Sequence, residues 1–498
     1  MAAGRYLIIV LIGCIVASCT KEVLKVVDVS EEPGKSSISI QLVLSSETRT
    51  RSAWDDYDYY FPSATPTPEE SKVSNILLII FKNIYLEEYV MYESDDFTIH
   101  GNTITLDKTE EEEHQIELEP GVHFFYAILN IPTGLHKEVK ALLENGKYTL
   151  TKEAFEKQLM EVNFNYLKGE TTGDMGFIMT NSTPPRSTIV YSKSQCEELN
   201  KTNDISISVG RALAKVSLAY VPAKTGELHG ALKNIKYTVV NNPSRMYLMP
   251  VIENDKLITP HYTTTNIPSD YFINPIRELA ANKNNAVWLD ATTEKIGEAA
   301  HFTYCIENNV KKHLKSNTTG LVIEGKFEPA QWLNPNGTTG TPAIDGSFWR
   351  IAEVDNDGYL LTYTKGYYNA SPDSLCATMG TDFRVKAYPG GICYYTFWPS
   401  SNDEHQIKRN DFHKIVITHI HGAGAPGIDE IVDPDVDPDP VPTWGRLVVY
   451  AVGWDDHPQE EIIGEESKDD DEYDGGMGIP GWDENDQEET LEGDNKFN

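Results

Sequence analysis

The sequence predicts a mainly β protein made of two β-sandwich domains with a few short helices. Strand-sized segments recur along most of the chain, either apolar throughout or with apolar and polar residues in alternation. Gly, Pro, Asn or Asp bound these segments, in a chain with 35 Gly and 27 Pro among 498 residues. The 40 % of apolar residues and the 26 Tyr are enough to fill sizeable cores, which argues against a disordered chain.

The chain is strongly acidic. It has 42 Lys and Arg against 76 Asp and Glu, a formal net charge of −34. A charge of this sign and size repels phosphate groups, so we expect neither nucleic-acid binding nor docking on anionic membranes.

The first nineteen residues predict export. Arg5 is the only charge before an apolar stretch at 6–16, which is too short to span a bilayer as a helix. Small residues then precede Cys19, in a pattern that resembles the lipobox of bacterial lipoproteins. We therefore expect a signal peptide at 1–18 and lipidation, for example by palmitate, at Cys19. The alternative is an ordinary signal peptide cleaved near Ala17, with Cys19 incidental.

A half-buried strand is the first predicted element of the mature chain. Its buried face carries four apolar residues at alternate positions: Ile38, Ile40, Leu42 and Leu44. The chain then becomes polar and turn-like, and Arg49 and Arg51 stand one residue apart in this stretch.

The rest of the N-terminal half contains three predicted strands and two predicted helices. The strands are Val73–Tyr85, Gly121–Asn130 and Ile205–Tyr220, the last as one strand or a bulged pair. Apolar residues at helical spacing predict the helices Lys137–Glu144 and Lys152–Leu159. The composition turns to Lys, Gly and Glu near residue 225, which predicts an N-terminal domain at 52–225.

The second half repeats this pattern and predicts a C-terminal sandwich at 226–428. Its expected strands are Asn234–Val240, Ala299–Glu307, Thr318–Phe327, Gly358–Thr364, Phe383–Ala387, Gly391–Trp398 and Phe412–Ile420. The segment 429–464 combines an extended Pro/Asp-rich linker with a last strand, Arg446–Trp454. The tail at 465–498 has 14 acidic and 2 basic residues and is expected to be disordered.

Residues that could carry catalysis or bind a metal form no recognisable site. The common hydrolase, nucleotide-binding and metalloprotease motifs are absent from the sequence, so no catalytic residue, cofactor or enzymatic activity is predicted. His419 and His421 would point the same way on a strand and His413 lies nearby, but the sequence suggests no further ligand. A strand end before a Gly-rich turn is the favoured interpretation, and no metal site is predicted.

Four cysteines follow Cys19 in the sequence, and their spacing contains no CxxC pair. They are Cys196, Cys305, Cys376 and Cys393. The spacing argues against a zinc site, while export permits disulfides. A bridge between Cys376 and Cys393 would close the shortest loop, but spacing leaves the connectivity open.

Several segments, in order along the chain, resemble the fimbrillin family, the shaft subunits of Bacteroidales type V pili. The resemblance is strongest to the major subunit of the minor fimbria. It rests on the lipobox at Cys19, the apolar strand before Arg49 and Arg51, Gly210–Val216 (GRALAKV), Tyr304–Asn308 (YCIEN), Tyr388–Tyr395 (YPGGICYY) and Lys408–His413 (KRNDFH). The resemblance implies transthyretin-like sandwiches, a cell-surface location and a role in adhesion and biofilm formation.

The resemblance also implies a route of assembly. An outer-membrane lipoprotein precursor is cut after Arg49 or Arg51 by an arginine-specific surface protease, so that 19–51 is a lipidated propeptide carrying the first strand. A strand from another copy then fills the groove that is left, giving a head-to-tail polymer. The donor strand would present Leu447, Val448, Val449, Tyr450, Ala451, Val452 and Trp454. Expected partners are other copies, anchor and tip subunits, the protease and, before cleavage, membrane lipid.

Two other interpretations stay open at this point. The protein could be a monomeric, permanently lipid-anchored surface protein, either a pilus anchor or tip subunit or a glycan-binding lipoprotein. In that case Arg446–Trp454 completes its own sheet, and Arg49 and Arg51 are ordinary loop charges. A glycan hydrolase is the weakest of the three, because no pair of carboxylates stands in a recognisable context.

Overall fold

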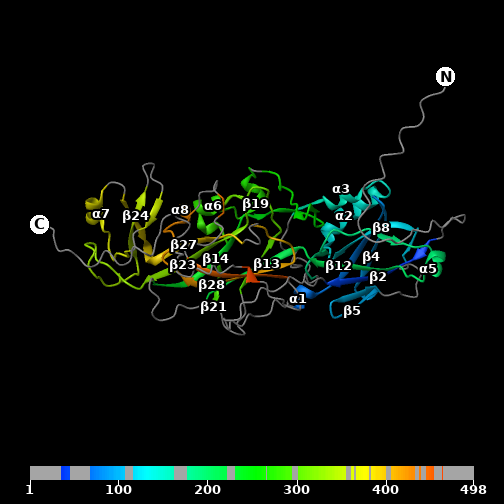
Figure 1. Ribbon diagram of the computed structural model, residues 1–498, viewed down its shortest axis with the longest axis horizontal. Coiled ribbons are helices and arrows are strands. Elements are labelled where there is room, and N and C mark those ends of the chain that lie inside the picture. The colour runs from blue at the N-terminus through cyan, green and yellow to red at the C-terminus, as the bar shows by residue number, and fades with distance from the viewer. Residues whose placement is uncertain are drawn as a thin grey trace, which may run out of the picture.

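The computed structural model describes residues 35–44, 68–106, 116–161, 176–220, 230–264, 266–293, 301–354, 360–363, 366–380, 383–399, 405–431, 437–438, 445–453 and 462–463. The described chain is mainly β and elongated, with an N-terminal sheet at one end and a small sheet with α7 at the other (Figure 1). The predicted signal peptide, Cys19, Arg49, Arg51, Trp454 and the acidic tail lie outside these residues.

The N-terminal domain is built on one nine-stranded sheet. Its order is β4 (Tyr85–Glu93), β3 (Asn75–Lys82), β8 (Gly121–Leu129), β10 (Met179–Asn181), β12 (Asp204–Arg211), β2 (Ser39–Leu44), β6 (Thr103–Leu106) and β5 (Phe97–His100), and β11 (Thr188–Val190) also pairs with β8. The sheet thus joins the predicted first strand to segments up to 165 residues away in sequence, since Ser39 pairs with Asp204.

β3 is apolar throughout because both of its faces are buried. Leu77 and Ile79 pack toward the helices α2 (Thr133–Gly146) and α3 (Lys152–Glu156), whereas Ile76 and Leu78 face the core that contains β2. The Thr151 hydroxyl caps the start of α3 by accepting a hydrogen bond from the Ala154 N–H at 3.2 Å. The structure ends α3 at Glu156, three residues before the predicted end, because residue 159 begins β9 (Leu159–Glu161) and pairs with β16 (Arg245–Tyr247).

The polypeptide crosses from the first sheet to the second at Ala212. β12 pairs in the N-terminal sheet, whereas β13 (Leu213–Tyr220) pairs with β22 (Phe302–Ile306) and β28 (Asp411–Ile420) in another. The predicted segment Ile205–Tyr220 is therefore a pair of strands in two sheets. A Cβ on Gly210 would lie 3.0 Å from the Asn410 side chain, whose Oδ1 accepts the Arg211 N–H at 2.9 Å. A glycine here lets the two domains approach closely.

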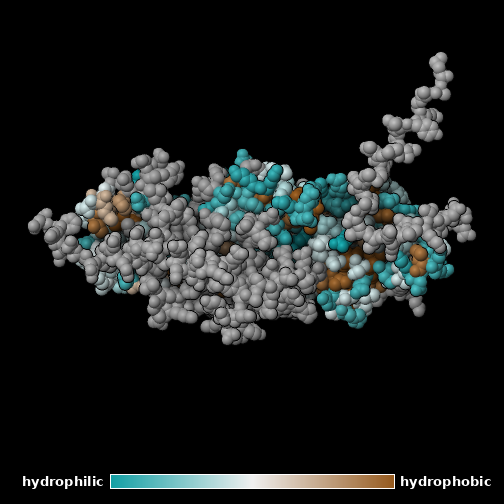
Figure 2. Space-filling model, in the orientation of Figure 1, coloured by the Kyte–Doolittle hydropathy of each residue, from teal (hydrophilic) through white to brown (hydrophobic). Residues whose placement is uncertain are grey.

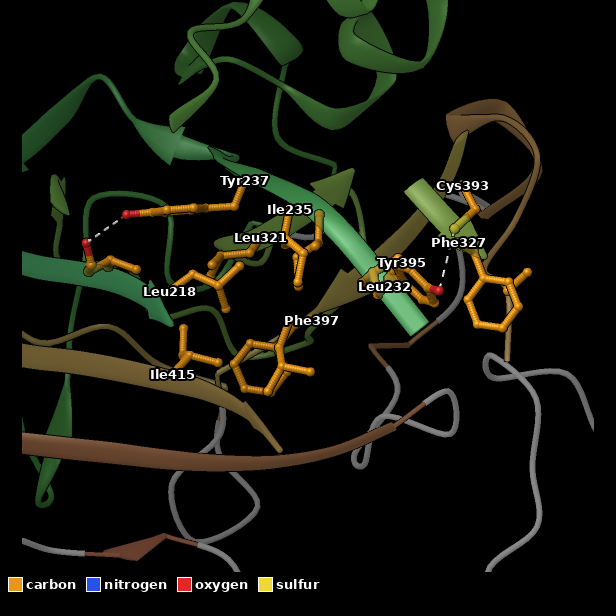
Figure 3. Packing of buried hydrophobic residues seen from close by; sticks show 14 of the residues in the cluster. Leu218, Leu232, Ile235, Tyr237, Leu321, Phe327, Cys393, Tyr395, Phe397 and Ile415 are labelled. Atoms are coloured by element: carbon orange, nitrogen blue, oxygen red, sulfur yellow. Dashed lines mark hydrogen bonds between the residues drawn. The ribbon is translucent and has the colours of Figure 1, made fainter. Parts of the chain in front are cut away.

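The second sandwich packs two sheets face to face, as predicted. One sheet has the order β21 (Thr292–Thr293), β13, β28, β29 (Gly445–Gly453), β30 (Ile462–Ile463), and the other β20 (Leu289–Asp290), β14 (Gly230–Val240), β23 (Gly320–Pro329), β27 (Ile392–Phe397). Figure 3 shows Leu218 and Ile415 of the first sheet facing Tyr237, Leu321 and Phe397 of the second. The Tyr237 hydroxyl donates to the Val216 carbonyl at 3.4 Å, so it is not left unpaired in this core.

Smaller elements surround the two sandwiches. A three-stranded sheet has the order β25 (Leu360–Tyr363), β24 (Phe348–Val354), β26 (Phe383–Tyr388) and lies next to α7 (Asp373–Met379). The other elements are β1 (Ser36–Ser37) with β7 (Glu117–Leu118), β15 (Asn242–Pro243) with β19 (Phe272–Ile273), β17 (Ile252–Glu253) with β18 (Lys256–Leu257), α1 (Pro68–Ser71), α5 (Lys193–Leu199), α6 (Ile276–Ala281), α8 (Ile428–Ile431), and the 3₁₀ helices η1 (Ser94–Asp96), η4 (Ser269–Tyr271), η5 (Lys283–Asn285) and η6 (Pro389–Gly391).

The four cysteines among the described residues form no disulfide bridge. Cys196, Cys305, Cys376 and Cys393 are all free, so the Cys376–Cys393 pairing considered from the spacing does not form. Burial raises the pKa of the Cys393 thiol to about 11 and raises that of Cys305 further. These two thiols fill core volume and are poorly suited to act as nucleophiles.

Candidate functional site: the first and last strands

The first strand lies inside the N-terminal sheet, with a bonded neighbour on each side. β2 runs parallel to β12 in a register of six residue pairs, from Ser39↔Asp204 to Val209↔Leu44. On its other side it is antiparallel to β6, where Leu42 pairs with Ile104. β2 therefore uses both rows of its backbone N–H and C=O groups, as an interior strand does.

The buried face of β2 is the one that the alternation predicts. Ile38, Ile40 and Leu42 are 8 %, 5 % and 0 % exposed and belong to the core that also holds Ile104 and Ile207. Leu44 is half-buried and packs against the same core. Each fully buried side chain of this size contributes about 1.5–3 kcal/mol, so β2 is a substantial part of the core.

Further hydrogen bonds hold the start of β2. The Asn203 side-chain amide donates to the Ser36 hydroxyl at 3.0 Å, and the Asn203 carbonyl accepts the Ser39 N–H at 3.0 Å. The Ile38 N–H donates to the Ile116 carbonyl at 3.3 Å. The start of β2 thus lies beside Asp204, at the end of β12 farthest from the crossing to the second sandwich.

Residues 45–67 connect β2 to α1 and contain Arg49 and Arg51. This segment lies outside the described residues, so the structure does not place the predicted cleavage site. α1 follows it, and Glu70 of α1 is 1 % exposed and bonded to Lys215 and Tyr304 of the second sandwich. β2 and α1 are therefore each anchored separately in the folded protein.

The last strand lies in its own C-terminal sheet. β29 is antiparallel to β28, in a register from Asp411↔Gly453 to Ile420↔Gly445, and β30 pairs with it at Val449 and Tyr450. The predicted strand Arg446–Trp454 is confirmed in its backbone over 446–453, and this pairing is the one expected if the strand completes its own sheet. The two-residue β30 is its only neighbour on the outer side among the described strands.

The sequence analysis does not predict the buried ion pairs at the junction of the two domains, although Lys215, Glu307 and Arg409 lie in segments that carry the family resemblance. Nε and Nη2 of the Arg409 guanidinium donate hydrogen bonds to the Glu307 carboxylate, at 2.7 and 2.5 Å. The third nitrogen, Nη1, donates to the Thr180 hydroxyl of the N-terminal sheet at 3.0 Å. Lys215 and Glu70 form a second buried pair. Charged residues within otherwise apolar strands, such as Lys215 between Ala214 and Val216, were the available signal for these contacts.

Within the described ranges, the side chains offer no arrangement for metal binding. Among these residues no three His, Cys, Asp or Glu side chains converge as a metal ion would require. The helices among them include none that is both long and apolar enough to cross a bilayer.

The structure thus defines a protein of two β-sandwiches with an interior first strand and a last strand near a sheet edge. No family model matches the sequence, and no curated protein matches it. The solved structures to which this chain is similar include a fimbrilin (FimA) of Porphyromonas gingivalis W83, which is 14 % identical, with a TM-score of 0.40 over 85 % of this chain and 99 % of that one. They also include the tip fimbrial protein Mfa3 of the same species, which is 12 % identical (TM-score 0.35; 84 % and 99 % covered), and a fimbrial assembly protein of Parabacteroides distasonis, which is 9 % identical (TM-score 0.32; 84 % and 95 % covered).

Proposed function

We propose that this protein is a structural subunit of a cell-surface fimbria, without enzymatic activity, that polymerises by exchange of strands between copies. The precursor is exported as an outer-membrane lipoprotein through Cys19 and is cut after Arg49 or Arg51. The single observation that carries the proposal is the position of β2. This strand lies inside a sheet, and its only link to the rest of the chain on the C-terminal side is the segment that holds both arginines.

Loss of β2 would leave a gap in the sheet that is energetically unfavourable unless another strand fills it. The facing edges of β12 and β6 would lose their backbone partners, and the pockets now filled by Ile38, Ile40 and Leu42 would open. Unpaired strand edges and exposed apolar pockets are both costly in water. A strand from another molecule restores the hydrogen bonds and fills the pockets at alternate positions.

The last strand has the form of the donor. β29 is nine residues long against six in β2, and Leu447, Val449 and Ala451 repeat the alternate spacing of the β2 pockets. Val448, Tyr450 and Val452 offer the same spacing on the opposite face, followed by Trp454. Residues 432–444, between α8 and β29, give the strand a tether on which to leave its own sheet.

Release of β29 leaves the other strand pairs of its sheet in place. The described core residues of the second sandwich include side chains of β13, β14, β23, β27 and β28, and β28 keeps β13 as a neighbour when β29 leaves. Before assembly, β29 pairs with β28 of its own molecule. This intramolecular pairing competes with insertion of β29 into another copy.

The experiment that tests the proposal is N-terminal sequencing of the protein in material sheared from the cell surface. A start at Thr50 or Ser52 means that the lipid and β2 have been removed, which supports the polymer. A start at acylated Cys19 in all of the sheared protein contradicts it.

The pairing of β29 with β28 also favours a second candidate, a monomeric lipid-anchored surface binding protein such as an anchor or tip subunit. Such a protein keeps β2 and Cys19 in its mature form. Sheared material would then lack it, and detergent would be required to extract it from the outer membrane.

A further inference from the structure

The N-terminal sheet carries a cluster of exposed apolar side chains at the end where β3 stops and β8 begins. Ile84, Val122 and Ile189 are 53 %, 37 % and 54 % exposed. Val122 and Ile189 pair directly across β8 and β11, so their side chains lie on the same face of the sheet. The Asn83 N–H donates to the Val122 carbonyl at 2.8 Å, which places the adjoining Ile84 beside them. We call these three residues the distal rim.

The distal rim lies at the end of the molecule that is farthest from the second sandwich. β12 runs from Asp204 at this end to Arg211, where the chain crosses into the second sandwich. Figure 1 places α5 and β8 at the same end of the molecule, and Figure 2 shows apolar surface there around α5 and the neighbouring strands. A β-branched apolar residue such as Ile84 is unusual in a tight turn, where Asn, Gly and Asp are favoured.

Hydrogen bonds link the strand that carries Ile189 to the start of β2. Asn203 bonds Ser36 and Ser39 at that start, and its side-chain amide also exchanges two hydrogen bonds of 2.9 Å with the backbone of Tyr191. Tyr191 directly follows β11, the strand that carries Ile189. The place where β2 enters the sheet and the rim therefore share one side of the molecule.

The chain direction of β2 determines at which end of the sheet the rest of a donor molecule must lie. A strand that replaces β2 in its parallel register with β12 begins beside Asp204, at the distal end. In the donor, the 13 residues 432–444 separate α8 from β29. Thirteen residues span at most about 45 Å, so the second sandwich of the donor lies within reach of the distal rim.

We infer that the distal rim is a contact surface for a second copy of this chain. That copy is the donor, whose last strand fills the channel left between β12 and β6 when β2 is removed. This inference rests on the proposed function and adds to it a contact outside the channel. The rim buries its apolar side chains against the body of the donor, so that each junction is held by the inserted strand and by this second contact. Such a contact raises the rate of productive docking and limits bending between successive subunits.

The test separates the strand from the body of the donor. A synthetic peptide of residues 445–454 contains the strand alone and cannot reach the rim, whereas growth of polymer from the protease-processed full chain requires the body to dock. The rim variant combines Val122→Glu and Ile189→Glu. The matched control places the same change at two exposed apolar residues elsewhere, Ile252→Glu and Val287→Glu, whose side chains are 43 % and 80 % exposed.

We expect the processed rim variant to bind the peptide as tightly as the wild type does, by fluorescence anisotropy, while its polymer grows about tenfold more slowly. The control variant is expected to match the wild type in both measurements. Equal growth of the rim variant and the wild type overturns the inference and leaves the proposed function intact. A wild type that takes up no peptide and forms no polymer overturns the proposed function and this inference with it.

A second rim variant guards against misfolding. Val122→Thr and Ile189→Thr keep the β-branched shape and remove apolar surface without adding charge. If the glutamate variant does not fold, the threonine variant is used to test the inference. We then expect slower polymer growth and unchanged peptide binding. Loss of peptide binding in a folded threonine variant contradicts the inference, because the rim would then be part of the channel.

Discussion

The ammonium group of Lys215 lies 2.9 Å from Oε1 of Glu70, and both side chains are buried, at 6 % and 1 % exposure. The same carboxylate oxygen accepts a hydrogen bond of 2.7 Å from the Tyr304 hydroxyl. Desolvation lowers the pKa of Lys215, and the charge of Glu70 opposes this shift. Glu70 lies on α1, the first described element after the segment with both arginines, so this contact fastens that part of the chain to the second sandwich.

Glu70→Ala should lower the free energy of unfolding by about 3 kcal/mol, because it removes one partner of a buried ion pair. Urea unfolding followed by circular dichroism measures the change. Glu88→Ala is the control, since Glu88 and Lys147 are 42 % and 39 % exposed in their pair and should contribute less than about 1 kcal/mol. Equal effects of the two substitutions would show that the Glu70 contact does not stabilise the junction.

Leu42→Ala should destabilise the unprocessed precursor by about 2–5 kcal/mol, since Leu42 is completely buried in the N-terminal core. The processed polymer should keep wild-type stability, because the strand that carries the change has been removed. Thermal unfolding of both forms gives the comparison. Ile104→Ala on β6 is the control and should destabilise both forms, because β6 stays in the mature protein. A polymer weakened by Leu42→Ala would mean that β2 is retained.

Arg49→Ala combined with Arg51→Ala should yield a folded, lipidated precursor that does not assemble, because the bond that releases β2 is no longer cut. Electron microscopy of the cells and N-terminal sequencing of the isolated protein are the measurements. Each single substitution serves as a control and identifies the arginine that is used. Filaments of normal length on cells of the double variant would refute cleavage at these residues.

Deletion of residues 446–498 should stop polymer growth while the subunit still folds, because β28 keeps its pairing with β13 when β29 is absent. The deleted subunit should still accept a strand from an intact copy and so cap filaments. Mixing experiments read out by filament length test this expectation. Aggregation of the deleted chain, or filaments of unchanged length in the mixture, would count against it.

Stability should fall as the pH rises above 10. Burial, with a smaller effect from Asp96, raises the pKa of Tyr92 to about 12, and burial raises that of Tyr394 to about 12. The folded state then holds these protons while the unfolded state, with a tyrosine pKa near 10, releases them. The stabilisation is complete below pH 10 and is lost as the pH approaches 12, at about 2 kcal/mol per tyrosine.

Urea unfolding of the wild type and of Tyr92→Phe between pH 8 and 11 measures this dependence. The variant should lose less stability over this range, because it lacks one of the titrating groups. Tyr148→Phe, at a side chain that is 68 % exposed, is the control and should follow the wild type. Identical slopes for all three proteins would mean that Tyr92 does not contribute.

The sequence by itself determined the mainly β class and the place of the principal strands. The alternation in 38–44 predicted which face of β2 is buried, and the apolar runs predicted β3 and β8, because strand periodicity is a property of neighbouring residues. β4 was missed: its residues Tyr85–Glu93 mix apolar and charged side chains, five successive ones being half-buried, and it is set by pairing with β3. The end of α3 was likewise set by a distant partner, Tyr247, which pairs with Leu159.

The tertiary structure alone decided which strands meet. β2 is bonded to β12 and β6, the chain changes sheets at Ala212, and Lys215 is paired with a carboxylate 145 residues earlier. The partner of β29 was also decided by the tertiary structure. Its sequence predicts a strand, but not whether that strand pairs with β28 or with another molecule. The physical reason is that backbone hydrogen bonding is the same for every strand, so the choice of partner depends on register, side-chain volume and charge across contacts that are remote in sequence.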